Sequence, residues 1–384
     1  MNRRPRPAGP RHSRTLLLDA LRRAESLTQV ELAATTGLTP GTVSAAVAAL
    51  DAEGLVRVVD TIRSGRRARS VSLATSGGAL TGVHCYRDAV RVVVDPGNDR
   101  PTVAGTVPLP GGHRAEHAVR EARTLLDDLL SETGTDPADV AAVGVGVPSP
   151  VEVSTGRVFG SGVRDGWDEI VATPALFAPA PDVPVVFDND GNLGALAEAR
   201  LGAGRGCRTV VRVAVSEGVS GGIVAGGEVV HGRTGTAGEL GHLTIDPDGA
   251  MCSCGNRGCL QVYAGSTAVL DLLAASHGPL TLPEVLNYAA EGDLGCRRVL
   301  TDVGRHLGTA MASVCTVLDP DVVVVGGTLA QAGDLLLDPL REMLGERTAV
   351  TSGAVARVVA GQLGEAASAR GALLLARDAV LASR

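Results

Sequence analysis

Three of the chain's seven cysteines lie within eight residues, in the pattern Cys252-x-Cys254-x4-Cys259. Nine residues separate the first of them from His242 on its N-terminal side. Three thiolates and one imidazole form a closed tetrahedral zinc site, which holds a loop in place and leaves no open position for catalysis. The alternative is a set of buried free thiols packed as small hydrophobic groups. Glycines interrupt the run as a tight metal-binding turn requires, so the spacing predicts a structural zinc ion bound by these four side chains.

Length and composition indicate an ordinary folded protein. A chain of 384 residues forms two or three domains, and 45% hydrophobic with 20% charged residues is typical of globular proteins. No run of about 18 apolar residues occurs, so we expect no membrane span. Residues 1–13 are basic but lack the apolar stretch of a secretory signal, and we interpret them as a flexible arm. Seven cysteines with one dense cluster fit a reducing compartment, so we expect a cytoplasmic protein.

The net charge of −7 hides an asymmetry between the two ends of the chain. Residues 1–75 carry 12 arginines against 6 acidic residues, whereas the remainder carries 23 arginines against 36 acidic residues. A basic segment attached to an acidic body indicates that the segment binds a polyanion. Aromatic residues make up only 2% of the chain, which disfavours stacking on unpaired bases. Double-stranded DNA is therefore the expected partner.

The basic segment has the pattern of a helix-turn-helix. Leucines in residues 14–24 follow the spacing of one buried helical face, and Thr28 with Glu31 forms a capping-box pattern that starts a second helix over 29–35. A glycine turn follows, and then Thr39-Pro40 begins a third helix, which ends near residue 53. In this layout the last of the three helices enters the major groove of DNA.

An arginine-rich hairpin follows the predicted helices. Residues 55–60 and 71–73 read as paired strands, and an arginine-rich segment joins them. This segment is the expected wing of a winged helix-turn-helix over residues 14–75, placed to contact phosphates or the minor groove. A three-helix dimerisation module with solvated arginines is the alternative. The side chains expected to contact DNA are Thr39, Thr42, Ser44, Arg63, Arg66 and Arg67.

The rest of the chain alternates short β-branched runs with helical stretches, which predicts an α/β architecture with sheets covered on both faces. The expected strands are residues 90–94, 140–147, 183–187, 210–215 and 322–325, and the expected helices are residues 193–201, 267–276, 282–290 and 296–318.

Glycine-rich and acidic motifs follow one another in a fixed order along this body. They are Gly144-Val145-Gly146-Val147-Pro148, Asp188-Asn189-Asp190-Gly191-Asn192, Ser216-Glu217-Gly218-Val219-Ser220-Gly221-Gly222, Ala237-Gly238-Glu239-Leu240-Gly241-His242, the cysteine cluster and Asp319-Pro320-Asp321. In this order the motifs resemble the ROK family, which contains sugar kinases and sugar-responsive repressors on a two-lobed actin-like (ribonuclease H-like) fold. The resemblance covers essentially the whole chain, including the winged helix of the family's regulators. It implies a ROK domain over residues 80–384, with lobe one about residues 80–190 plus the C-terminal helix and lobe two about residues 191–365.

The resemblance also implies a sugar site. Asn189, Asp190, Glu239 and His242 match the residues that hold sugar hydroxyls in the family's kinases, and Gln261 stands where those kinases carry a glutamate. Carboxylates and amides offer a polyol the acceptors and donors it needs. We expect His242 to bind zinc through one ring nitrogen and to face the sugar with the other.

The predicted phosphate-binding turns depart from the kinase pattern. The kinases' first turn reads G-x-D-x-G-G-T, and here His84 replaces the aspartate while Tyr86 and Arg87 replace the later glycines. Side chains block the close approach that glycine permits, and Asp88 adds a negative charge beside the phosphates, part of which Arg87 could neutralise. In the second turn Glu217 replaces a threonine, which would set another carboxylate against a polyphosphate. We therefore expect a disabled phosphoryl-donor site and no catalytic residue.

Together these features predict a sugar-responsive transcriptional regulator, most simply a repressor, rather than an enzyme. We expect the winged helix to bind a pseudo-palindromic operator as a homodimer or a dimer of dimers, and a sugar or sugar derivative to act as effector. The main alternative is an ATP-dependent sugar kinase that carries a DNA-binding domain. A regulator whose body binds no ligand is a third possibility.

Overall fold

A computed structural model describes most of the chain, as follows: residues 10–22, 24, 26–63, 66–74, 78–97, 100–159, 166–171, 173–348 and 355–383. The chain forms two compact units, one ending at Ala79 and the other spanning Leu80–Ser383. None of the helices in the described part is long and apolar enough to cross a membrane.

The N-terminal unit is a winged helix-turn-helix. Its elements are α1 Pro10–Arg22, β1 Leu27–Thr28, α2 Gln29–Thr36, α3 Pro40–Ala52, β2 Val56–Arg63 and β3 Arg66–Leu73. The three strands form one antiparallel sheet in the order β1-β3-β2, and Arg63 pairs with Arg66 beside the wing turn. Leucines and valines on the inner faces of the helices, among them Leu17, Leu32 and Val47, are fully or almost fully buried.

Local sequence signals set the helix boundaries in this unit. The capping box is confirmed, because the hydroxyl of Thr28 accepts a hydrogen bond from the backbone of Glu31 and the Glu31 carboxylate accepts one from the backbone of Thr28. Thr39 caps α3, with Pro40 at the first helical position. The first helix begins at Pro10, so the last four residues of the arm predicted for residues 1–13 are helical. Proline suits a first helical position because its missing N–H would have no intrahelical partner there.

The larger unit contains two five-stranded sheets, which confirms the α/β prediction. The first sheet has the order β10-β7-β4-β5-β6 and the second the order β13-β12-β11-β14-β15. The strands of the first sheet are β4 Ala79–Cys85, β5 Ala89–Asp95, β6 Val103–Pro108, β7 Val140–Val147 and β10 Val185–Asn189. Those of the second sheet are β11 Thr209–Val215, β12 Val219–Ala225, β13 Glu228–Val229, β14 Val322–Gly326 and β15 Arg357–Ala360. A short hairpin joins β8 Val151–Glu152 to β9 Arg157–Val158.

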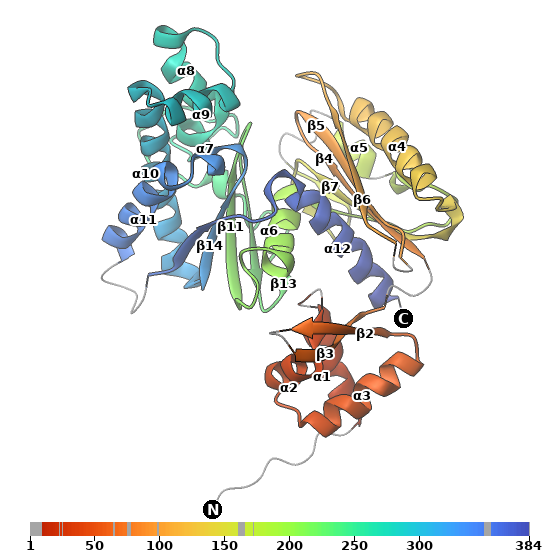
Figure 1. The fold of residues 1–384 in the computed structure, drawn as a ribbon. Coiled ribbons are helices and arrows are strands. Elements are labelled where there is room, and N and C mark those ends of the chain that lie inside the picture. The colour runs from red at the N-terminus through yellow and green to blue at the C-terminus, as the bar shows by residue number, and fades with distance from the viewer. Residues whose placement is uncertain are drawn as a thin grey trace, which may run out of the picture. The chain divides into compact units, whose positions relative to one another are not determined.

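Helices cover both sheets (Figure 1). They are α4 Ala115–Glu132, α5 Trp167–Val171, α6 Asp190–Leu201, α7 Gln261–Ala264, α8 Ser266–His277, α9 Leu282–Glu291, α10 Leu294–Leu318, α11 Asp334–Thr348 and α12 Ala367–Ala382. One face of the second sheet buries apolar side chains against α10 and α11, and the other face packs on α6. Between the two sheets, α6 packs directly against α12, which in turn lies on β7 of the first sheet.

Glycines in the strands and in α12 allow this close packing. A Cβ atom at Gly144 of β7 would lie 1.9 Å from the carbonyl oxygen of Ala372, and one at Gly82 of β4 would lie 2.3 Å from that of Ala369. Both oxygens belong to α12, so the helix backbone rests on the glycine surface of the sheet. On the other side of the helix, a Cβ atom at Gly371 would lie 2.0 Å from a backbone oxygen of α6. These three glycines therefore fix where α12 meets the first sheet and α6.

Candidate functional site

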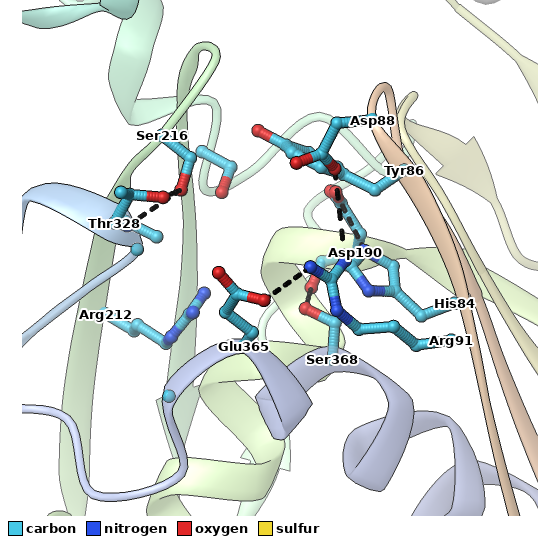
Figure 2. Close-up of a pocket in the computed structure, with 14 residues that line it drawn as sticks. His84, Tyr86, Asp88, Arg91, Asp190, Arg212, Ser216, Thr328, Glu365 and Ser368 are labelled. Carbon is cyan, nitrogen blue, oxygen red and sulfur yellow. Dashed lines mark hydrogen bonds and ion pairs between the residues drawn. The ribbon is translucent and has the colours of Figure 1, made fainter. Parts of the chain in front are cut away.

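A cleft of about 490 Å³, open solvent included, lies around the first residue of α6 (Figure 2). Its walls come from both sheets and from the segment before α12. The residues that line it are His84, Tyr86, Asp88, Arg91, Asp190, Arg212, Ala214, Ser216, Ser220, Gly327, Thr328, Gly364, Glu365 and Ser368. Of the side chains predicted to bind sugar, only Asp190 is among them.

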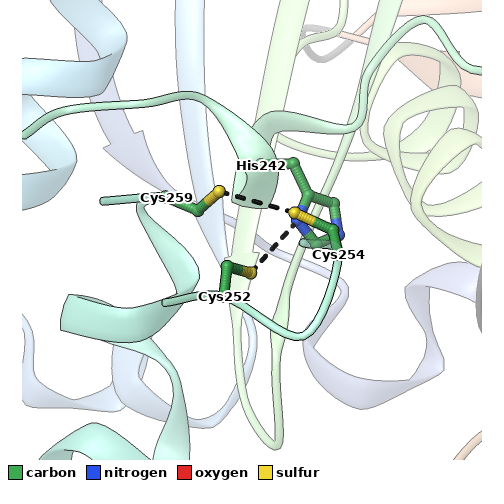
Figure 3. A group of neighbouring side chains, drawn as sticks. All are labelled: His242, Cys252, Cys254 and Cys259. Carbon is green, nitrogen blue, oxygen red and sulfur yellow. Dashed lines mark hydrogen bonds between the residues drawn. The ribbon is translucent and has the colours of Figure 1, made fainter. Parts of the chain in front are cut away.

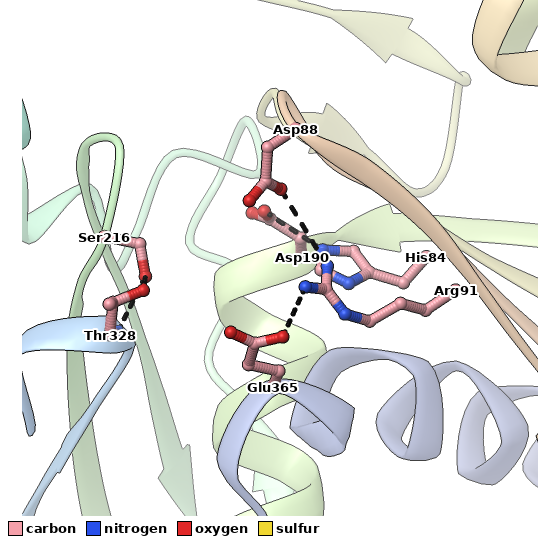
Figure 4. Close-up of polar contacts among 7 residues, drawn as sticks. All are labelled: His84, Asp88, Arg91, Asp190, Ser216, Thr328 and Glu365. Carbon is pink, nitrogen blue, oxygen red and sulfur yellow. Dashed lines mark hydrogen bonds and ion pairs between the residues drawn. The ribbon is translucent and has the colours of Figure 1, made fainter. Parts of the chain in front are cut away.

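The backbone around Asp190 is held by its neighbours. The side-chain oxygen of Asn189 accepts hydrogen bonds from the N–H groups of the first turn of α6, and Ser368 Oγ of α12 donates to the carbonyl oxygen of Asp190 at 2.8 Å. Asp190 is only 5% exposed. His84 Nε2 lies 3.5 Å from the Oδ2 atom of its carboxylate (Figure 4). The carboxylate thus points into the cleft from a rigid helix start.

Tyr86 joins the first sheet to the turn between β11 and β12. The backbone N–H of Gly218 lies beside the Tyr86 hydroxyl. Burial together with the nearby charge of Asp190 raises the pKa of that hydroxyl, and the Gly218 N–H acts in the opposite direction. Gly218 belongs to the glycine-rich turn that the resemblance matches to a phosphate-binding turn. In this structure a side chain of the same protein therefore lies beside this turn.

Ionic contacts close one side of the cleft. Arg91 Nη2 lies 2.6 Å from Glu365 Oε2, and Arg91 Nη1 lies 4.0 Å from Asp88 Oδ1 (Figure 4). Among the described residues the ion-pair partner of Asp88 is Arg91 on β5, and no ion pair joins Asp88 to its neighbour Arg87. Glu217 is exposed and does not line the cleft. The repulsion that we predicted between its carboxylate and a polyphosphate therefore does not act on a ligand inside this cleft.

Arg212 is a cleft residue that the sequence analysis missed. It lies on β11, is 5% exposed, and points into the cleft from the second sheet (Figure 2). Burial lowers its pKa, while the charges of Glu198 and Asp190 act in the opposite direction. The available signal was a single charged residue within the apolar run of residues 209–215.

The other predicted sugar-binding residues lie near Asp190 but are not all gathered in one place. Burial, and then the charge of Asp190, raises the pKa of Glu239 to about 7. Glu239 Oε2 is 3.9 Å from His242 Nε2. Asn189 uses its side-chain oxygen to cap α6. Gln261 lies beside the glycine-rich turn, 3.5 Å from where a Cβ atom of Gly218 would stand.

The predicted zinc ligands come together as expected from their spacing (Figure 3). All four ligand atoms lie within 4.8 Å of one another. Cys252 Sγ is 3.6 Å from His242 Nδ1, and Cys254 Sγ is 3.7 Å from Cys259 Sγ. A tetrahedral zinc ion with bonds of about 2.3 Å to sulfur and about 2.0 Å to nitrogen sets its ligand atoms roughly 3.5 to 3.8 Å apart. The donor set therefore fits zinc, with Nδ1 of His242 facing the thiols and Nε2 facing Glu239.

In the N-terminal unit, the residues predicted to contact DNA lie at the start of α3 and on the wing. Thr39 and Ser44 are exposed, whereas the half-buried Thr42 shares a hydroxyl hydrogen bond of 2.9 Å with Thr39. Arg67 is exposed on β3. The side chains of Arg63 and Arg66, and the wing turn between them, lie outside the described part of the chain.

Similar proteins include both enzymes and regulators. Over 233 residues the chain is 35% identical to a glucokinase of Halalkalibacterium halodurans, covering 56% of this chain and 70% of the relative. Over 363 residues it is 25% identical to the xylose repressor of Bacillus subtilis, covering 93% of this chain and 92% of the relative.

Solved structures are similar in fold. A ROK family glucokinase from Streptomyces griseus in complex with glucose and AMPPNP has a TM-score of 0.67 at 28% identity, covering 78% of this chain and all of that one. A ROK family transcriptional regulator described as a homolog of the E. coli MLC protein has a TM-score of 0.69 at 21% identity, covering 96% and 95%. Residues 10–67 match the MarR family. Because residues 113–379, more than half of the chain, match the ROK family, the protein belongs to that family.

Proposed function

We propose that this protein is a sugar-responsive transcriptional repressor of the cytoplasm whose kinase-like body detects a sugar without phosphorylating it. The observation that carries the proposal is the contact between Tyr86 and Gly218. In the family's kinases, backbone N–H groups of the glycine-rich turns approach the nucleotide phosphates. Here the Tyr86 hydroxyl already lies beside the N–H of Gly218. A nucleotide would have to displace a half-buried phenol ring to reach it.

The surroundings of Asp190 support a retained sugar site. Asp190, Glu239 and the imidazole of His242 form a polar group beside α6, and the rigid backbone at the start of α6 orients the first of them. We assign Asn189 and Gln261 to the edges of the same site. Zinc, when bound, would hold the loop of three cysteines and keep the His242 ring turned toward Glu239. Loss of the metal would therefore disturb the sugar site and not only the loop.

The N-terminal unit supports the DNA-binding half of the proposal. Its fold and its match to the MarR family suit insertion of α3 into the major groove. Ser44 lies exposed on that helix, and Arg67 lies exposed on the wing strand. We propose that Thr39, Thr42 and Ser44 contact base edges or nearby phosphates, and that Arg67 contacts the phosphate backbone together with Arg63 and Arg66 of the wing. A homodimer on a pseudo-palindromic operator is the assembly that this fold favours.

Two measurements on the full-length protein test the proposal. Genomic fragments bound by the protein are selected, and their release is then titrated with a panel of sugars. We expect saturable release, or saturable tightening, by one sugar class, with neighbouring transport or catabolic genes pointing to its identity. On the selected operator, Arg67→Ala should weaken binding to all sequences and lower the slope of log affinity against log salt by about 1, whereas Ser44→Ala should change sequence preference.

The kinase alternative has a specific basis, since Asp190 is retained in the position of the kinases' base and glucokinases are among the relatives. A coupled assay with ATP and the same sugar panel separates the two functions. Turnover above about 1 per second, an ordinary enzymatic rate, would refute the repressor proposal as stated. Saturable sugar binding without turnover would support it.

A further inference from the structure

Arg212 is a buried cation that has no hydrogen-bond partner among the described residues. Its side chain belongs to β11, is 5% exposed, and lines the cleft. The structure gives it no hydrogen bond and no ion pair with any other described residue, and its Nε atom is buried without an acceptor. An arginine carries more N–H donors than any other side chain and accepts none. Leaving these donors unpaired in a buried position is costly, so a partner from outside the protein is needed.

Two glycines leave space for the side chain of Arg212. A Cβ atom at Gly194 of α6 would lie 2.4 Å from Arg212 Nη1, and one at Gly326 of β14 would lie 2.9 Å from Nη2. The guanidinium therefore lies in a slot between two glycines, where any larger residue would collide with it. Such a slot holds the guanidinium in one orientation and leaves its open side to the cleft (Figure 2).

A second unpartnered group lies in the same cleft. His84 is 5% exposed, and neither of its ring nitrogens makes a hydrogen bond, although Nε2 is 3.5 Å from Asp190. The hydroxyl groups of Ser216 and Thr328, which lie 3.2 Å apart, complete a set of donors on the wall that carries Arg212. The cleft thus presents the guanidinium of Arg212, whose charge Glu198 and Asp190 balance only from a distance, beside a histidine and two hydroxyls that can turn toward a ligand.

The charges around the cleft limit which anion can bind. Asp88 and Glu365 share Arg91, and Asp190 lines the same cleft. A polyphosphate would bring several negative charges close to these three carboxylates. A compact anion can reach the guanidinium fork while keeping its single anionic group on that side.

We propose that Arg212 is the anchor of a binding site for a small-molecule ligand that bears one compact anionic group, a carboxylate or a phosphate monoester. The site goes beyond the proposed sugar response, because it would bind an anion whether or not a neutral sugar is sensed beside Asp190. Its chemistry is that of an arginine fork facing two anionic oxygens, assisted by the His84 ring and the neighbouring hydroxyls.

The test uses the full-length protein and two probes, inorganic phosphate and gluconate, with chloride at equal ionic strength as the reference. Calorimetry and thermal unfolding measure binding, since a ligand that binds only the folded protein raises its thermal midpoint with concentration. Arg212→Met removes the anchor. Arg205→Met is the matched control, because Arg205 is an exposed arginine in the turn after α6.

We expect saturable binding of at least one probe to the wild-type protein, at least tenfold weaker binding to Arg212→Met, and unchanged binding to Arg205→Met. Binding of phosphate alone assigns a phosphate group, and binding of gluconate alone assigns a carboxylate. Equal affinity in Arg212→Met and wild type would overturn the proposal, as would the lack of saturable binding of either probe to the wild-type protein. If Arg212→Met fails to fold, Arg212→Lys keeps the charge but loses the fork, and unchanged affinity in that variant would equally overturn it.

Discussion

Substitution of Gly144 by alanine should displace α12 and weaken both the fold and the ligand cleft. The new Cβ atom would lie 1.9 Å from the carbonyl oxygen of Ala372, 2.8 Å from its carbonyl carbon and 3.1 Å from the backbone nitrogen of Ala376. All three contacts are with the backbone of a helix, which cannot change rotamer to relieve them. To restore an ordinary separation of 3.4 Å, the helix must retreat by about 1.5 Å.

A displacement of that size has a calculable effect. Forcing extra atoms into a packed interior costs typically about 1–3 kcal/mol, and a contact between two backbones falls at the upper end, so we expect a loss of about 3 kcal/mol. Because α6 packs against the opposite side of α12, the same movement would press α12 onto α6 and disturb the 2.8 Å hydrogen bond from Ser368 to the carbonyl oxygen of Asp190. Gly144→Ala should therefore also weaken binding of any ligand that depends on the position of Asp190.

Urea unfolding followed by tryptophan fluorescence measures this loss in the body alone. Trp167 is the only tryptophan of the chain and is 2% exposed, within α5 of the larger unit. Gly111→Ala is the control, since a Cβ atom there would meet nothing within 4 Å, and its free energy of unfolding should stay within about 0.5 kcal/mol of wild type. A Gly144→Ala protein that is as stable as this control would refute the packing argument.

Three further outcomes follow from the site. Cys254→Ser should lose zinc and sugar response together, measured as metal content and sugar-dependent DNA binding; a response that survives without metal would contradict the link through the zinc loop. Tyr86→Gly should raise affinity for a non-hydrolysable ATP analogue by about tenfold, the equivalent of one recovered hydrogen bond to Gly218, and unchanged affinity would count against the blocked donor turn. The 2.7 Å hydrogen bond from His231 to Asp188 raises the pKa of His231, so its stabilisation should be complete below the ordinary pKa of about 6.5 and decline as pH rises through the raised value. Comparing the pH dependence of unfolding in wild type and His231→Gln checks this, and a difference that grows with pH would contradict it.

Local patterns in the sequence were sufficient to predict most of the secondary structure. The capping box of Thr28 and Glu31 and the Thr39-Pro40 start of α3 depend on residues within one helical turn of each other, so they are readable without the fold. The β-branched runs correctly predicted β7, β11 and β14, because strands buried on both faces need apolar side chains at nearly every position. The zinc ligands were found for a similar reason, since three of the four lie in one short segment.

Contacts between distant segments were decided by the tertiary structure alone. The sequence set Tyr86 in a degenerate turn, but only the fold brings its hydroxyl to the N–H of Gly218. The sequence suggested that Arg87 neutralises the charge of Asp88, whereas in the structure Arg91 on β5 forms the ion pair with Asp88.

The sequence by itself determined that this chain joins a basic winged helix to an acidic α/β body with a cysteine-rich loop, because composition, capping and spacing act over a few residues. The tertiary structure decided that glycines seat α12 on the first sheet and that Arg212 makes no hydrogen bond with any residue of the described segments. Such facts depend on which backbone atoms approach within a few ångströms after folding, and no local pattern specifies that distance.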